Sequence, residues 1–223
     1  MNYIAIIGDI KNSKKIQLRD KVQNKLNLIL SEINEIYSDD ISARFLITLG
    51  DEFQGLLQNS AHLLDIIRYI QRKMYPVKLR FGIGFGRINT AIHSDAAIGA
   101  DGPAYYTARK IIEQLRAQEK RLKRQAPDIQ IGIYEMEILR LQEINTILSL
   151  LTLLENEWSE GQRLTIWDME QYGGNQAECA KRMNTTQSTI ARRLAGGCYL
   201  AYQQASETVR KSIKQLEENI GEL

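Results

Sequence analysis

The chain has 223 residues, of which 43% are hydrophobic and 25% are charged, and its formal net charge is +2. This length fits one large domain or two smaller ones, and the composition is ordinary for a folded protein. No apolar run of about 18 residues occurs, which argues against a membrane span. The small net charge does not by itself indicate a nucleic-acid partner.

The start of the chain and its cysteines indicate a compartment. The first residues lack the basic and apolar segments of a signal peptide, so export is not expected. Cys179 and Cys198 lack the spacing of metal ligands, and free thiols are typical of the cytoplasm. We therefore expect a cytoplasmic protein.

The first 140 residues alternate between two hydrophobic periodicities. Short apolar or alternating runs predict strands, and apolar residues spaced three and four apart predict helices. In chain order, we expect a strand over residues 3–9, a helix over 18–36, strands over 41–49 and 53–57, a helix over 63–74, a strand over 77–86, a helix over 103–124 and a strand over 129–134. The first helix should begin near Asn12 and Ser13, which are good capping residues.

This order predicts an α+β domain with the ferredoxin-like, split βαβ topology, in which a middle strand runs antiparallel between two parallel ones. The first strand then ends at the sheet edge where the 41–57 hairpin turns. Asp9 ends that strand and Asp51 lies in the turn, so we expect both carboxylates to bind one Mg²⁺ or Mn²⁺ ion. Alternatively, Asp51 only makes the turn and Asp9 only caps the following helix.

The loop after Asp9 suits a phosphate group. It carries lysines and leads towards a helix start, whose unpaired amides and dipole favour anions. A metal beside such a loop is the arrangement that a nucleoside triphosphate needs. The residues expected to bind a nucleotide or phosphorylated ligand here are Ile10, Lys11, Asn12, Ser13, Lys14 and Gly50.

Several segments of this region resemble known nucleotide cyclases. Residues 48–57, Thr-Leu-Gly-Asp-Glu-Phe-Gln-Gly-Leu-Leu, resemble the signature hairpin of diguanylate cyclases, the GGDEF family. Gly8-Asp9-Ile10, Gly50-Asp51 and residues 80–86, Arg-Phe-Gly-Ile-Gly-Phe-Gly, are similar to three landmarks of class III nucleotidyl cyclases. The resemblance implies a cyclase or palm-type domain over residues 1–140.

The same resemblance implies metal-binding roles for Asp9 and Asp51. It also places Arg109 near the last cyclase landmark, where we expect it to bind the nucleotide. The sequence departs from the family at Ile47, where cyclases that use ATP have a base-reading lysine, and in the late helix, which lacks an asparagine. The charged run from Arg116 to Arg124 is expected to be a solvated helix end, or alternatively to add to phosphate contact.

Residues 141–223 are expected to form a second, all-α domain, because strand patterns stop and helical segments are separated by glycine pairs. Within it, residues 176–194 are similar to a bacterial helix-turn-helix. Asn184 falls where the tight turn needs a left-handed residue. Asn175 with Glu178 makes a capping box for the first helix.

The second helix of this motif would present hydrogen-bond donors to a DNA major groove. The residues expected to contact DNA are Lys181, Arg182, Gln187, Ser188, Thr189, Arg192 and Arg193. The same geometry also serves as a packing or oligomerisation module, and the charge of this half is nearly balanced.

Over its whole length the chain resembles the SatD family of bacterial proteins, which implies the same two-part architecture. The combined prediction is a cytoplasmic, homodimeric DNA-binding regulator whose cyclase-like domain binds a metal and a nucleotide or phosphorylated small molecule. One alternative is a metal-dependent nucleotidyl cyclase or nucleotidyltransferase. Another is a catalytically inactive scaffold for protein interaction.

Overall fold

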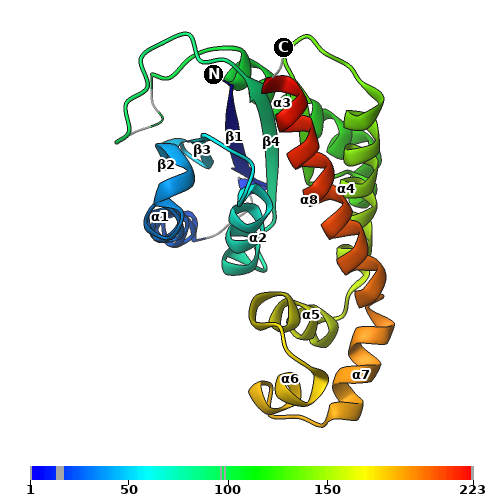
Figure 1. Ribbon diagram of the computed structural model, residues 1–223. Helices are drawn as coiled ribbons and strands as arrows, with labels where there is room; N and C mark the ends of the chain where they lie inside the picture. Colours follow the sequence, from blue (N-terminus) through cyan, green and yellow to red (C-terminus); the bar gives the residue numbers. More distant parts are fainter. Residues whose placement is uncertain (1, 14–17, 96, 98, 222–223) are drawn as a thin grey trace.

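The computed structural model describes residues 2–13, 18–95, 97 and 99–221 (Figure 1). A five-stranded sheet forms the centre of the larger part, and three short helices, α5 to α7, project from one end of the molecule. The elements are β1 (Tyr3–Ile10), α1 (Arg19–Ile36), β2 (Ile41–Leu49), β3 (Glu52–Leu57), α2 (Leu63–Met74), β4 (Leu79–Gly86), α3 (Pro103–Leu122), β5 (Ile129–Ile133), α4 (Leu139–Glu157), α5 (Glu160–Tyr172), α6 (Gln176–Arg182), α7 (Gln187–Gly196) and α8 (Tyr199–Gly221), with 3₁₀ turns η2 (Ser38–Asp40) and η3 (Lys123–Gln125). Among the described helices, none combines the length and apolarity that crossing a membrane requires.

The strands lie in the order β2-β3-β1-β4-β5. β1 pairs antiparallel with both β3 and β4, β3 pairs antiparallel with β2, and β4 pairs parallel with β5. The predicted neighbour relation is therefore confirmed, because the strand that leaves the turn at residues 50–51 lies directly beside the first strand.

The expected start of the first helix is wrong. α1 begins at Arg19, and Leu18 takes the capping position without a side-chain hydrogen bond. Asn12 and Ser13 instead lie in a turn after β1, where Asn12 has φ of 54°. That left-handed conformation suits a turn and not a helix.

The two faces of the sheet are packed differently. Ile4, Ile6 and other side chains of one face join α1, α2, α4 and α8 in the main core. The opposite face packs against α3, and there β4 presents glycine at alternate positions, Gly82, Gly84 and Gly86. A Cβ atom on Gly84 would lie 2.0 Å from the carbonyl oxygen of Ala104, so these glycines let the α3 backbone approach the sheet.

On each of the two outer strands, an asparagine side chain from a covering helix forms hydrogen bonds with the strand backbone. On β2, the Asn34 side chain donates to the Phe45 carbonyl (2.9 Å) and accepts from the Phe45 amide (2.7 Å). On β5, the Asn145 side chain makes the same two bonds with the backbone of Ile131, at 2.8 Å each. Each amide therefore replaces the missing neighbouring strand at one residue.

The expected division at residue 140 does not separate two cores. Leu148 of α4 and Val209 and Ile213 of α8 belong to the main core with the sheet. A separate, smaller core holds α5, α6 and α7 together around Ile166 and Ile190, with the C-terminal end of α4 and the first residues of α8. In Figure 1, α8 runs alongside α4 from this smaller unit to the sheet.

Replacing Asn34 with alanine should lower the free energy of unfolding by about 1–3 kcal/mol, because the buried amide and carbonyl of Phe45 lose their partners. Denaturant titration monitored by circular dichroism measures this. Asn24→Ala on the exposed face of α1 is the matched control and should change the value by less than about 0.5 kcal/mol. Equal effects of the two substitutions would contradict the capping role of Asn34.

Candidate functional site

The end of β1 brings charged side chains from three strands onto one face of the sheet. Asp9 lies opposite Glu52 of β3 and opposite Arg80 of β4. Directly opposed residues point to the same face, which here is the face that α3 covers. Gly50 lies in the turn between β2 and β3 and has φ of 65°, a conformation that glycine adopts without strain.

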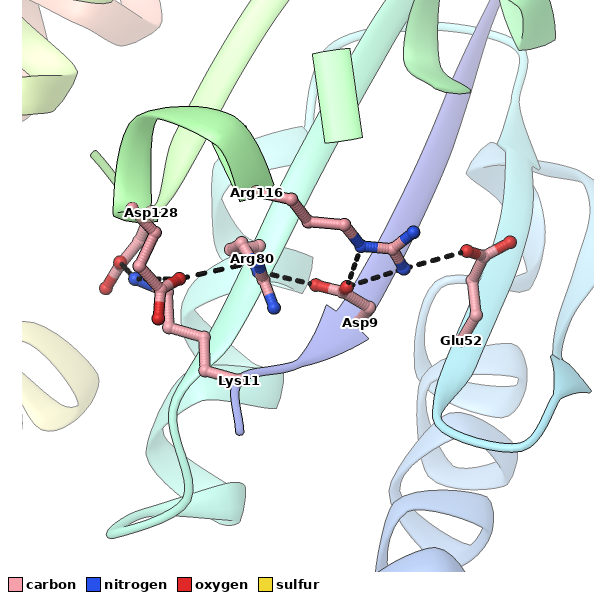
Figure 2. Close-up of polar contacts among 7 residues, drawn as sticks. Asp9, Lys11, Glu52, Arg80, Arg116 and Asp128 are labelled. Atoms are coloured by element: carbon pink, nitrogen blue, oxygen red, sulfur yellow. Dashed lines mark hydrogen bonds and ion pairs between the residues drawn. The ribbon is translucent and has the colours of Figure 1, made fainter. Parts of the chain in front are cut away.

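Asp9 is the centre of this cluster, and only 1% of its surface is exposed. Its Oδ1 accepts a hydrogen bond from Arg80 Nε at 2.9 Å, and its Oδ2 accepts one from Arg116 Nε at 2.7 Å (Figure 2). The Arg116 guanidinium also reaches Glu52, with 3.3 Å between Nη2 and Oε2. A buried carboxylate requires such compensation, because removing its charge from water is costly.

A second group of charges continues from Arg80. Arg80 Nη1 lies 3.4 Å from Glu119 Oε2, and Lys11 Nζ lies 3.5 Å from the same oxygen. Lys11 also pairs with Asp128 (Figure 2). Burial raises the pKa of the Asp128 carboxyl, and the charge of Lys11 opposes this shift. The side chain of Lys11 is only 9% exposed, so its charge is engaged within the protein and does not face solvent.

A second acid, Glu52, lies beside Asp9 at this edge, and the sequence prediction did not include it. Glu52 and Asp9 both pair with the guanidinium group of Arg116. Asp51 has a different partner, with 3.9 Å between its Oδ1 and Arg19 Nη2. Nowhere in the described ranges do three or more metal-ligating side chains gather as a possible metal centre. Because guanidinium groups already occupy both oxygens of Asp9, this arrangement does not fit a resident Mg²⁺ or Mn²⁺ ion.

The predicted phosphate ligands are also largely engaged. The amide of Ile10 donates to the Asp51 carbonyl (3.2 Å), and the amide of Lys11 donates to the Lys78 carbonyl (2.9 Å). The Gly50 carbonyl accepts a hydrogen bond from the side chain of Gln23.

Three further predicted ligands differ in their surroundings. Arg109 Nη1 lies 3.6 Å from Glu52 Oε1, at the margin of the Asp9 cluster. Asn12 and Ser13 lie in the turn that follows β1. Lys14 lies outside the described residues.

Arg80 and Arg116 are the partners that the sequence prediction missed. Arg80 could have been found, because it is a charged residue within an otherwise apolar and glycine-rich strand. The charge pattern predicts a solvated helix end at Arg116, but Arg116 binds a carboxylate 107 positions away in the sequence. Nothing in the local pattern of the helix predicts that contact.

The predicted turn in the C-terminal half is present. Asn175 and Glu178 form the expected capping box of α6, and Asn184 has φ of 47° in the turn before α7. Thr186 caps α7 by accepting a hydrogen bond from the Thr189 amide at 3.2 Å.

The seven predicted DNA-contacting residues divide into two groups. The side chains of Lys181, Gln187, Ser188 and Arg192 are exposed, and Thr189 is half-buried. Arg182 instead binds Asp168 of α5 through Nε and Nη2, at 2.9 and 2.6 Å. Arg193 lies against α5, with Nη1 3.5 Å from the Thr165 hydroxyl.

The Asp9 cluster should show strong coupling in a double-mutant cycle. Unfolding of the wild-type protein, Asp9→Asn, Arg116→Gln and the double variant should give a coupling free energy of about 1–3 kcal/mol, because the Asp9 carboxylate is buried although Arg116 is partly exposed. The exposed pair Glu207 and Lys211 on α8 is the control, and its coupling should stay below about 0.5 kcal/mol. Equal coupling in both pairs would show that Arg116 is not needed to compensate Asp9.

The chain shows distant likeness to several solved structures. A bacterial light-regulated adenylyl cyclase is 12% identical with a TM-score of 0.42, and the match covers 58% of this chain and 74% of that one. The guanylate cyclase domain of RhGC from Catenaria anguillulae, in complex with GTP, is 16% identical with a TM-score of 0.38, covering 48% of this chain and 70% of that one. The monomeric guanylyl cyclase domain of the RhoGC fusion protein from the aquatic fungus Blastocladiella emersonii is 16% identical with a TM-score of 0.40, covering 49% of this chain and 72% of that one.

Likeness at this level assigns no activity, and no curated protein matches the chain. The match to a protein family is of a different kind, since it extends over nearly the whole sequence. The SatD family model matches residues 3–213, and the chain therefore belongs to the SatD family.

Proposed function

We propose that this protein binds DNA, with α6 and α7 acting as a helix-turn-helix and α7 as the recognition helix. The observation that carries the proposal is the exposed polar surface at the start of α7, where Gln187 and Ser188 face solvent. Recognition helices contact base edges mainly through their N-terminal residues. Arg192, about one turn further along, is also exposed and would contact a base or a phosphate.

The packing of the three-helix unit supports this role. α5, α6 and α7 share a small core, and Figure 1 shows that the unit projects away from the sheet, so a duplex could reach α7. Arg182 and Arg193 bind α5 in this arrangement, and we assign them to positioning α6 and α7. The contacts to DNA would then come from Lys181, Gln187, Ser188, Thr189 and Arg192.

The sheet would serve as the body that carries this unit. Its antiparallel order β2-β3-β1-β4 supports a ferredoxin-like assignment, extended by β5. We further propose that the protein works in the cytoplasm as a homodimer, because helix-turn-helix proteins commonly bind two half-sites related by two-fold symmetry.

A second candidate is metal-dependent nucleotidyl transfer at the end of β1. One observation favours it. Asp9 and Glu52 both pair with the guanidinium group of Arg116, and the Arg116 side chain is 42% exposed. Opposing it, each Asp9 oxygen already accepts a hydrogen bond from an arginine. We therefore place DNA binding first.

The DNA proposal predicts measurable binding to the DNA upstream of the protein's own gene. Fluorescence anisotropy should show an affinity that falls steeply with salt, because phosphate contacts release counterions. Arg192→Ala should weaken binding by about tenfold or more. Lys211→Ala, on the exposed face of α8, is the matched control and should leave the affinity unchanged. Absent binding, or binding that is insensitive to salt, would refute the proposal.

Incubation with each nucleoside triphosphate and Mg²⁺ or Mn²⁺ distinguishes the two candidates. We expect no cyclic or transferred product by chromatography, because Asp9 is already neutralised by Arg80 and Arg116. Product that forms with the wild-type protein and disappears in Asp9→Asn would establish the second candidate instead. Ser31→Ala on the surface of α1 controls for a contaminating activity.

A further inference from the structure

A cavity of about 610 Å³ lies between the sheet-bearing part of the molecule and the three-helix unit. α2 forms one wall and α5 forms the opposite wall. α4, α8 and the two tyrosines that follow α1 and α2, Tyr37 and Tyr75, supply the remaining side chains. Its volume falls within the range that binds small molecules and cofactors. The cavity is separate from the Asp9 cluster, since it shares no lining residue with it.

The arginines of this cavity are not equivalent. Arg68 pairs with Glu155, and Arg210 pairs with both oxygens of Asp65 at 2.8 and 3.0 Å. Arg72 differs, because its Nε is buried and has no hydrogen-bond partner among the described residues. Burial lowers the pKa of Arg72, and the like charge of Arg68 adds to this shift. The nearby Tyr202, Glu170 and Glu155 oppose it.

A second polar atom in the same cavity has no partner. The hydroxyl of Ser206, on α8, is buried without a hydrogen bond to any described residue. A guanidinium donates several hydrogen bonds in one plane, and a hydroxyl can donate one more. The oxygens of a phosphate or carboxylate accept hydrogen bonds from both groups, and they would supply the partner that Arg72 Nε lacks.

The cavity also has an aromatic and apolar wall. Trp167 of α5 packs edge-on against Tyr75, with 5.3 Å between ring centroids and 86° between planes. Tyr69, Tyr172 and several leucines line the same space. Flat apolar surfaces of this kind favour a planar ring system in a ligand.

We propose that this cavity binds a small anion with a planar aromatic body, whose phosphate or carboxylate is bound by Arg72 and Ser206. The aromatic part would pack against Trp167 and the neighbouring tyrosines. The inference stands apart from DNA binding, since neither the lining residues nor the test involves the exposed face of α7. It predicts that the anionic group and the ring are both required.

A thermal-shift panel on the full chain tests the proposal. The complete probes are AMP, GMP and the aromatic carboxylates anthranilate and indole-3-acetate, and the partial probes are adenosine, indole and inorganic phosphate. At least one complete probe should raise the melting temperature and change the tryptophan emission, because a ligand bound only to the native state stabilises it. Binding of the nucleotides would identify the anionic group of the ligand as a phosphate, and binding of the aromatic carboxylates would identify it as a carboxylate. A shift with partial probes alone, or with none, overturns the proposal.

Variants at Arg72 separate a binding role from a structural one. Arg72→Gln should weaken binding of the active probe by about tenfold or more, since a charge-assisted hydrogen-bond pair is lost. Its ligand-free melting temperature should stay unchanged or rise, because a buried Nε–H without a hydrogen-bond partner is removed. Arg121→Gln on exposed α3 surface is the charge-matched control and should bind as the wild type does.

A conservative variant covers the case in which Arg72→Gln does not fold. Arg72→Lys keeps the charge but loses the planar fork, so it should fold and bind about threefold to tenfold more weakly. Wild-type affinity in either variant would overturn the proposal. So would a lowered ligand-free melting temperature combined with unchanged binding, because that result assigns Arg72 to structure alone.

Discussion

The buried carboxylate of Asp9 determines how the centre of this molecule is arranged. Its two oxygens accept hydrogen bonds from β4 and α3, and the α3 arginine continues to Glu52 on β3. One acid therefore connects two neighbouring strands to the helix that covers them. The glycines of β4 bring the backbone of α3 close enough for this connection, so strand composition and ion pairing act together. With its charges compensated internally, this end of the sheet is better suited to holding the fold than to binding a further cation.

The features suited to binding lie elsewhere, around α5. This helix packs against α7, which carries the exposed polar face, and it also forms one wall of the cavity that contains Arg72. α8 reaches both regions, because its first turns belong to the smaller core and its later turns belong to the main core. The long helix therefore couples the position of the three-helix unit to the sheet through direct packing.

Much of the secondary structure could be predicted from the sequence, and the reasons for the failures are physical. Periodicity identified the strands and the pairing of the first strand with the one after the turn, and local chemistry identified the Asn175 capping box and the left-handed Asn184. The position of Glu52 beside Asp9 was not predicted, because which residue of the hairpin lies opposite Asp9 depends on a one-residue register. The role of Arg116 depends on a contact between segments far apart in the chain, which no local pattern encodes.

The asparagines at the two outer strands limit how copies of this protein can associate. An additional strand that approached β2 at Phe45 or β5 at Ile131 would have to displace a side-chain amide that already makes two hydrogen bonds. Sheet-to-sheet joining and fibril-like growth are opposed at both margins. At these two residues, edge-to-edge pairing between copies would therefore cost hydrogen bonds that the folded chain already makes.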